Sequence, residues 1–309
     1  MKLSQVIHTN GRATNNAFLK SFHTRSFDEG RLVRDKQILR PQKAILRPEF
    51  ADCQVKPFTT GSILGENTEL PRRFDWREKL PVLPQILEQE YFKTCWCHSV
   101  CTVLEYAHII RYGKHVALSA QQLIDYFYHF VNNDGQNTFW AMEFVRKFGI
   151  ARAVDYPYVG YHCEPKKFKP YVRFEDIRTW TEDEEKAIAK DHTPLQRELQ
   201  HGPIIVGLPG DADDADDGYR LKEYHGGLYT GPLRYTSGHV GVGVGYDFAK
   251  DIPRWIVQNS WGSKWGENGF VNVAHQGPKH SFLYLRPDEV HAEVTLLASE
   301  EDASMLAKP

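Results

Sequence analysis

Apolar residues recur at helical spacing along the stretch that follows residue 94. Five of them stand three and four positions apart and share one face of a helix that begins near Cys95: Val100, Val103, Leu104, Ala107 and Ile110. A second helix is predicted from Ser119, whose hydroxyl can cap the first turn while Gln122 closes a capping box. A third helix is predicted from Trp140 to Phe148, ended by Gly149.

After about residue 200 the period changes from helix to strand. Residues 204–206 are a short apolar run, and residues 239–246 alternate valine with glycine, so one face of that strand is too crowded for side chains. Residues 255–258 and 270–273 continue the strand pattern. A helical half followed by a β half predicts an α+β protein of two lobes. We expect a domain at 70–290, with a helical lobe at about 85–180 and a β lobe at about 181–290.

The two ends of the chain do not fit this pattern. The sequence Ile-Leu-Arg-Pro occurs at 38–41 and again at 45–48, and proline at this spacing favours extended chain over long helices. We expect residues 1–69 to be an extension, partly extended over the surface and partly disordered. Residues 291–309 are read as a tail with no assigned structure.

Composition narrows the class of protein. Hydrophobic residues make up 41% of the 309 positions and charged residues 25%, as in a soluble globular protein. The net charge of −2 argues against nucleic acid or an anionic membrane as the main partner. No uncharged apolar run approaches the ~18–20 residues that span a bilayer.

The cellular compartment is predicted from what the sequence contains and lacks. The N-terminus has no apolar signal-peptide core, and no Asn-x-Ser/Thr glycosylation site occurs. Residues 1–27 are basic and free of acidic residues, which fits a plain basic tail better than a transit peptide. We expect a reducing intracellular compartment.

Cys95 is the first candidate for chemistry, because it stands at the start of a predicted helix. A helix N-terminus favours a thiolate, and the thiolate is the nucleophilic form of cysteine. The alternative is a small buried core residue, the usual fate of a cysteine that forms no disulfide.

Three further side chains favour the interpretation of Cys95 as a nucleophile. His239 lies 144 residues after Cys95, at the start of the valine–glycine strand, and Asn259 follows 20 residues later. A thiolate–imidazolium pair needs a histidine from elsewhere in the fold and an acceptor that orients its ring. Gln89 lies six residues before Cys95, where its amide can donate to a developing oxyanion.

With these residues in order, the chain resembles the papain-like cysteine proteases over about residues 70–285. The pieces of the resemblance are Asp75-Trp76-Arg77, Gln89, Cys95-Trp96, Leu118-Ser-x-Gln-x-Leu-x-Asp125, Tyr156-Pro-Tyr158, Gly202-Pro203, Gly238-His239 and Asn259-Ser-Trp-Gly-x-x-Trp-Gly-Glu-Asn-Gly269. The family signature places histidine and asparagine ~130–150 residues after the cysteine. His239 falls inside this window and Asn259, at 164 residues, lies beyond it, which we attribute to insertions.

The resemblance implies a fold and a set of roles. The fold is a helical left lobe and an antiparallel β-barrel-like right lobe with the active site in the cleft between them. Cys95 attacks the scissile carbonyl, His239 pairs with the thiolate and protonates the leaving amine, and Asn259 orients the imidazole. Trp261 shields that hydrogen bond, and the Gln89 side chain with the Cys95 backbone N–H forms the oxyanion hole. The implied partners are polypeptide substrates and cystatin-like inhibitors, with no cofactor and a monomeric state.

The sequence departs from the family at several positions. The residues that replace half-cystines of the usual three disulfides are Phe92, Tyr126, Asp134 and Leu233, which fits a reducing compartment. Gln136 and Asn137 stand where the family has a glycine pair on the floor of the substrate cleft. Gly207 and Val240 align with the S2 wall, which implies a preference for an apolar P2 residue. Residues 1–69 lack the family's long inhibitory-helix pattern.

Two groups of residues could suggest metal sites, and neither fits a metal-binding pattern. Cys95, Cys97 and Cys101 contain no CxxC pair and no histidine in register, which favours buried or reactive thiols. The acidic stretch 211–218 fails the calcium-loop pattern, because a loop counted from Asp213 has Ala215 at its third position and Tyr224 at its twelfth. No metal is expected.

The function predicted from sequence is a cysteine endopeptidase built on Cys95, His239, Asn259 and Gln89. The main alternative is a weak or inactive homologue that binds peptides or regulates, motivated by the altered cleft pair and the missing disulfides. A third reading is another Cys–His chemistry, such as transglutaminase-like acyl transfer.

Overall fold

The computed structural model describes residues 69–89, 94–128, 138–178, 191–209, 221–231, 238–275, 286–288 and 291–292. In chain order, the elements of the N-terminal half are β1 (Arg73–Asp75), the 3₁₀ helix η3 (Trp76–Glu78), α3 (Cys95–Tyr112), α4 (Ala120–Tyr128), α5 (Thr138–Phe148), β2 (Val172–Arg173) and β3 (Asp176–Arg178). Those that follow are α7 (Thr193–His201), β4 (Ile204–Pro209), the 3₁₀ helix η4 (Leu221–Glu223), β5 (Leu228–Tyr229), β6 (Gly238–Asp247), β7 (Arg254–Gln258), β8 (Phe270–Ala274), β9 (Arg286–Asp288) and β10 (His291–Ala292).

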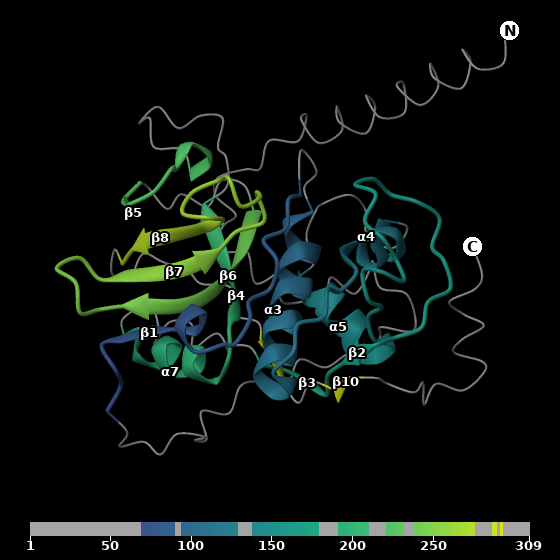
Figure 1. Cartoon of the computed structure of the whole chain (residues 1–309), viewed down its shortest axis with the longest axis horizontal. Coiled ribbons are helices and arrows are strands. Elements are labelled where there is room, and N and C mark those ends of the chain that lie inside the picture. Colours follow the sequence, from purple (N-terminus) through teal and green to yellow (C-terminus); the bar gives the residue numbers. More distant parts are fainter. Residues whose placement is uncertain are drawn as a thin grey trace, which may run out of the picture.

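Helices α4 and α5 and the main sheet lie on opposite sides of α3, whereas α7 lies against the sheet (Figure 1). Strands follow the order β1-β6-β7-β8-β5, and β4 pairs with β6. All pairs in this sheet are antiparallel except β5 with β8. This α+β arrangement of two lobes confirms the predicted fold class.

Helix α3 is buried on nearly all sides, because it packs against the sheet on one side and against α4 and α5 on the other. The prediction of a helix from Cys95 is confirmed, but its buried residues are not limited to the single apolar face that was expected. Ile110 was predicted on that face and is 37% exposed, whereas the polar residues His98 and Glu105 are buried. A helix enclosed by two layers buries polar as well as apolar residues, so a one-sided pattern cannot describe it.

The start of α4 shows half of the predicted capping box. Ser119 Oγ accepts the N–H of Gln122 at 3.0 Å, as expected for an N-cap. The Gln122 side chain does not return to Ser119. Its Oε1 accepts the N–H of Ala151 at 2.7 Å, and its amide donates to the carbonyl of Gly149. A tertiary partner thus replaces the local one, and it fixes the chain after α5 onto α4.

Hydrogen bonds hold the segment after Tyr156 to α4. Asp125 Oδ2 accepts the Tyr156 hydroxyl at 2.7 Å, and Oδ1 accepts the N–H of Cys163 at 2.8 Å. Tyr126, which stands in place of a half-cystine, donates its hydroxyl to the carbonyl of Lys166 at 2.9 Å. Cys95, Cys97, Cys101 and Cys163, the cysteines of the described part, form no disulfide.

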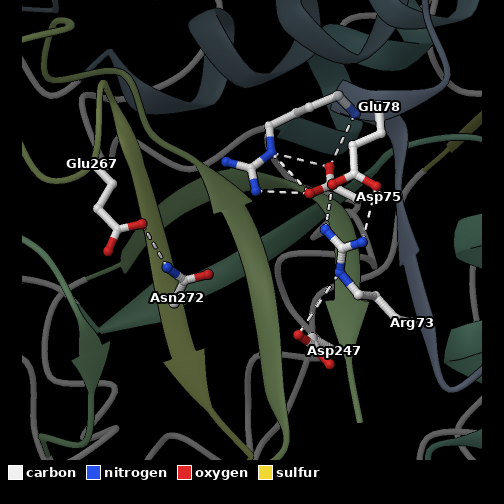
Figure 2. Close-up of polar contacts among 7 residues, drawn as sticks. Arg73, Asp75, Glu78, Asp247, Glu267 and Asn272 are labelled. Atoms are coloured by element: carbon white, nitrogen blue, oxygen red, sulfur yellow. Dashed lines mark hydrogen bonds and ion pairs between the residues drawn. The ribbon is translucent and has the colours of Figure 1, made fainter. Parts of the chain in front are cut away.

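Short strands at both ends of the domain pair with distant parts of the chain. β1 pairs with β6, and Arg73 of β1 forms an ion pair with Glu78 (Figure 2). Asp75, also of β1, forms an ion pair with Arg77. At the other end, β9 pairs with β3 and β10 pairs with β2, so the chain returns to the helical lobe after completing the sheet. The residue limits expected for the two lobes stay a prediction, but neither lobe is a single continuous stretch.

The glycines of β6 are needed because other backbone lies close to them, as the alternation with valine predicted. A Cβ on Gly241 would lie 2.8 Å from the carbonyl oxygen of Gln258, and one on Gly245 would lie 2.9 Å from Cα of Asp75. Real Cβ atoms do not approach backbone so closely. β6 can therefore be flanked by β1 and β7 only if these positions carry no side chain.

We expect Gly245→Ala to lower the free energy of unfolding by about 1–3 kcal/mol, because the new methyl group would overlap the backbone of β1. Gly243→Ala is the matched control. Its Cβ would lie 3.2 Å from the side chain of Val206 instead of overlapping backbone, so its cost should be smaller. Urea unfolding followed by tryptophan fluorescence measures both. Equal midpoints for the two variants would contradict the crowding at Gly245.

Candidate active site

Cys95 is the first residue of α3, and its side chain lies at the N-terminal end of a helix of 18 residues. Thr94, the N-cap residue, makes no side-chain capping bond, so that side chain does not occupy the N–H groups of the first turn. A helix N-terminus of this length favours an anion through these N–H groups and the helix dipole. The predicted nucleophile therefore occupies the position on α3 where a thiolate is best supported.

The other two cysteines of α3 have a different environment. Cys97 and Cys101 are fully buried, and burial raises the pKa of both thiols well above the ordinary value. Cys97 Sγ also donates to the carbonyl of Thr94 at 3.0 Å. Both are therefore held as protonated, apolar groups of the core, which matches the interpretation of buried thiols given to them from sequence.

His239 and Asn259 are joined by a hydrogen bond between β6 and the end of β7. His239 Nε2 lies 2.8 Å from Asn259 Oδ1. The backbone N–H of Ser260 donates to the same Oδ1 at 2.8 Å, which identifies that atom as an oxygen. An amide oxygen only accepts, so Nε2 carries the hydrogen and Nδ1 is the nitrogen that can exchange a proton with a thiol.

Trp261 covers this hydrogen bond. Its ring stacks on the His239 imidazole with 4.6 Å between centroids and an interplanar angle of 18°. Trp265 meets Trp261 edge to face at 5.0 Å. His239 is 8% exposed and Asn259 is 3% exposed. Because water is excluded here, the bond between imidazole and amide is stronger than it would be at the surface.

Gln89 is held beside the same block by Ser260. The backbone N–H of Gln89 donates to the Ser260 carbonyl at 2.8 Å, and the Ser260 hydroxyl donates to Gln89 Oε1 at 2.6 Å. Since Oε1 accepts from Ser260, the donor end of this amide is the one directed elsewhere. An isolated bridge between Glu88 and Trp261 continues the pairing of the two segments.

Helix α3 contacts strand β6 near Cys95 and near His239. Ser99 lies one turn after Cys95, and its hydroxyl donates to the carbonyl of Val240 at 3.2 Å. Val240 directly follows His239 on β6. The start of α3 and the first residues of β6 are thus in contact, so the end of the helix that begins with Cys95 lies close to the strand that begins with Gly238 and His239.

The predicted substrate-binding residues divide into two groups. Gly207 on β4 and Val240 on β6 stand directly opposite each other in the sheet, and both are half-buried. Gln136 and Asn137 lie outside the described residues, as does the acidic stretch 211–218. Among the residues that are described, no three His, Cys, Asp or Glu side chains are grouped as metal ligands would be. No helix in the described part is long and apolar enough to cross a bilayer.

Sequence reasoning missed three polar residues that connect to this site: Ser260, Ser99 and Tyr106. Ser260 holds Gln89, Ser99 contacts the strand of His239, and Tyr106 donates its hydroxyl to Gln258 Oε1 at 2.7 Å, next to Asn259. Each bonds to a residue between 141 and 171 positions away. The position of Ser260 inside the Asn259–Gly269 block was the only signal that could have drawn attention to any of them.

Comparisons with known proteins show the family of the chain. The pattern of the family described as papain family cysteine protease matches residues 70–282. Germination-specific cysteine protease 1 of Arabidopsis thaliana is 31% identical over 209 residues, covering 66% of this chain and 52% of that protein. Cysteine protease Amb a 11.0101 of Ambrosia artemisiifolia is 33% identical over 216 residues, covering 68% and 52%. The chain belongs to the papain family of cysteine proteases.

Solved structures show the same fold. The crystal structure of the Amb a 11 cysteine protease, a ragweed pollen allergen, in its proform matches with a TM-score of 0.63 and 27% identity, over 78% of this chain and 72% of that one. The Carica candamarcensis cysteine protease CMS1MS2, solved in complex with E-64, matches with a TM-score of 0.57 and 22% identity, over 71% and 99%. This chain spans about half the length of the two curated relatives above.

Proposed function

We propose that this chain is a cysteine-type endopeptidase, with Cys95 as the nucleophile, His239 as its acid–base partner and Asn259 as the residue that orients His239. The observation that carries the proposal is the hydrogen bond from His239 Nε2 to Asn259 Oδ1 beneath Trp261. This bond commits one ring nitrogen to the amide, so the other can exchange a proton with the thiol at the start of α3.

The reaction follows from these groups. His239 takes the proton of Cys95, and the thiolate attacks the carbonyl carbon of the peptide to form a C–S bond. When the C–N bond breaks, the imidazolium gives its proton to the leaving amine. Water, deprotonated by the same imidazole, then attacks the thioester, releases the carboxylic acid and restores the thiol.

Gln89 supplies a donor for the oxygen of the tetrahedral intermediate. Its side chain is fixed before substrate arrives, because Ser260 already holds Oε1. A donor fixed in advance need not reorganise during the reaction, which is the basis of oxyanion stabilisation. The Cys95 backbone N–H at the start of α3 is the second donor of the proposal.

Peptides are the proposed substrates, and the opposed pair Gly207 and Val240 is the proposed S2 wall. A glycine facing a valine across two strands leaves room for an apolar side chain and offers no charge to bind a polar one. Gln136 and Asn137 are the proposed floor of the cleft.

Covalent labelling with a peptidyl epoxide such as E-64 tests the proposal. We expect the full-length protein to be labelled once, at Cys95, and to hydrolyse peptides with an apolar P2 residue under reducing conditions. Cys95→Ala should lose both properties. Cys163→Ala is the matched control, because Cys163 is a half-buried thiol remote from α3 in sequence, and it should label like the wild type.

Three other outcomes would contradict the proposal. Equal labelling of wild type and Cys95→Ala would place the reactive group elsewhere. Labelling at Cys95 without any peptide hydrolysis would favour the inactive homologue that binds peptides. Incorporation of an added amine without hydrolysis would favour acyl transfer.

A further inference from the structure

Within the described part of the chain, Ser99 and Tyr106 each donate a hydrogen bond from α3 to the sheet, and each bond ends beside a residue of the proposed active site. Ser99 Oγ donates to the carbonyl of Val240, the neighbour of His239. Tyr106 Oη donates to Oε1 of Gln258, the neighbour of Asn259. The side chains of Tyr106 and Gln258 are both buried, with exposures of 0% and 2%.

The two donors lie on the same face of α3 as Cys95. With 3.6 residues per turn, Ser99 is about one turn and Tyr106 about three turns beyond Cys95. The two hydrogen bonds are therefore about 10 Å apart along the helix axis. Two fixed points on one face prevent the helix both from sliding along the sheet and from rotating on it.

Apolar side chains also join α3 to the sheet. One hydrophobic cluster contains Val100, Val103 and Leu104 of α3 together with Val242 and Ile256 of the sheet. Apolar burial is strong but has little directionality, so it keeps the lobes together without fixing their register. Buried hydrogen bonds have defined lengths and angles and supply that register.

We infer that Ser99 and Tyr106 are positioning residues of the proposed active site, which fix the sheet that carries His239 and Asn259 relative to the helix that carries Cys95. This inference rests on the proposed function. Neither residue touches substrate. Each acts on the peptide or side chain adjacent to a catalytic residue, where a displacement of about 1 Å is enough to reduce catalysis up to about 10²-fold.

The test compares Tyr106→Phe and Ser99→Ala with wild type in the full-length protein. The readouts are kcat and KM for a peptide, and the rate of Cys95 alkylation by iodoacetamide between pH 4 and 9. We expect each variant to lower kcat roughly tenfold with little change in KM. A tenfold weaker thiolate–imidazolium pair should also move the acid limb of the alkylation profile up by about one pH unit.

Tyr126→Phe is the matched control. It removes the same hydroxyl from another buried tyrosine, whose bond to the Lys166 carbonyl stays within the helical lobe. We expect Tyr126→Phe to lower the melting temperature while leaving kcat and the alkylation profile at wild-type values. A shift in pH profile therefore separates positioning from a general loss of stability.

A second variant separates the loss of positioning from the loss of stability that an unpaired Gln258 amide would cause in Tyr106→Phe. The double variant Tyr106→Phe/Gln258→Leu replaces both partners by apolar groups, which should recover the melting temperature. If the bond acts by positioning, kcat and the pH profile will not recover with it. Recovery of catalysis together with stability would overturn the inference.

The outcomes also separate this inference from the proposed function. A reactive wild type, with both single variants matching Tyr126→Phe in pH profile and kcat, overturns the positioning role alone. A wild-type Cys95 that alkylates no faster than an ordinary thiol at any pH overturns the proposed function and this inference with it.

Discussion

Replacing His239 with alanine is expected to reduce kcat/KM for a peptide at pH 7 by about 10⁴-fold or more, which is the scale seen when a catalytic base or its orientation is lost. The proposed mechanism uses the imidazole twice, to accept the proton of Cys95 and to protonate the leaving amine. Without it, the thiolate forms only by loss of the proton to solvent. The small remaining activity should therefore rise steadily as the pH approaches 8 to 9, where ordinary thiols ionise.

The measurement is a pH profile of kcat/KM from pH 5 to 9 for wild type and His239→Ala. His225→Ala is the control, because His225 is an exposed histidine of the β lobe and its removal should leave the profile unchanged. A loss of less than tenfold in His239→Ala, or an unchanged profile, would mean that another group ionises Cys95. The melting temperature of His239→Ala should be recorded too, since alanine removes the ring that stacks on Trp261.

The second large effect concerns stability in acid. His98 is 2% exposed, and its ring nitrogens make no hydrogen bond within the described residues. Burial lowers the pKa of His98 from 6.5 to about 4. Between these values the unfolded chain binds a proton that the folded protein resists, so stability falls as the pH drops from 6.5 towards 4. The loss from this one residue should reach about 2–3 kcal/mol near pH 4.5.

His98→Phe tests this expectation, because phenylalanine fills a similar volume and cannot bind a proton. The free energies of unfolding obtained from urea titrations at pH 7 and pH 4.5 should differ less in the variant than in the wild type, by the ~2–3 kcal/mol assigned to His98. His275 contributes in the same direction, since burial lowers its pKa to about 4, and it remains in both proteins. Equal pH dependence in the two proteins would show that His98 is hydrated or paired when folded.

The sequence predicted the parts of the structure that depend on nearby residues. The alternation of valine and glycine over 239–246 predicted a strand with one crowded face, and Gly241 and Gly245 do lie against backbone. Gly149 ends α5 with φ at +76°, as its position after Phe148 indicated. Cys95 does begin its helix. Each of these features is set by periodicity or by one residue's conformational range.

The parts that escaped prediction depend on partners far away in the chain. Gln122 was expected to bond locally and instead reaches the chain after α5, since tertiary partners compete with local ones for the same atoms. Ser260, Ser99 and Tyr106 each bond to a residue far away in the sequence, and no local pattern pairs them with Gln89, Val240 or Gln258. The order of cysteine, histidine and asparagine predicted which residues to compare, and only the fold supplies their orientation.

Each end of the domain pairs with the lobe formed mainly by the other half of the chain, and this limits how the protein can be divided. β1 completes the sheet of the β lobe from the N-terminal side, and β9 and β10 complete the small sheets of the helical lobe from the C-terminal side. No single cut in the chain yields two fragments that each contain an entire lobe. The lobes should therefore not be obtainable as separately expressed pieces, and they should melt together in one transition.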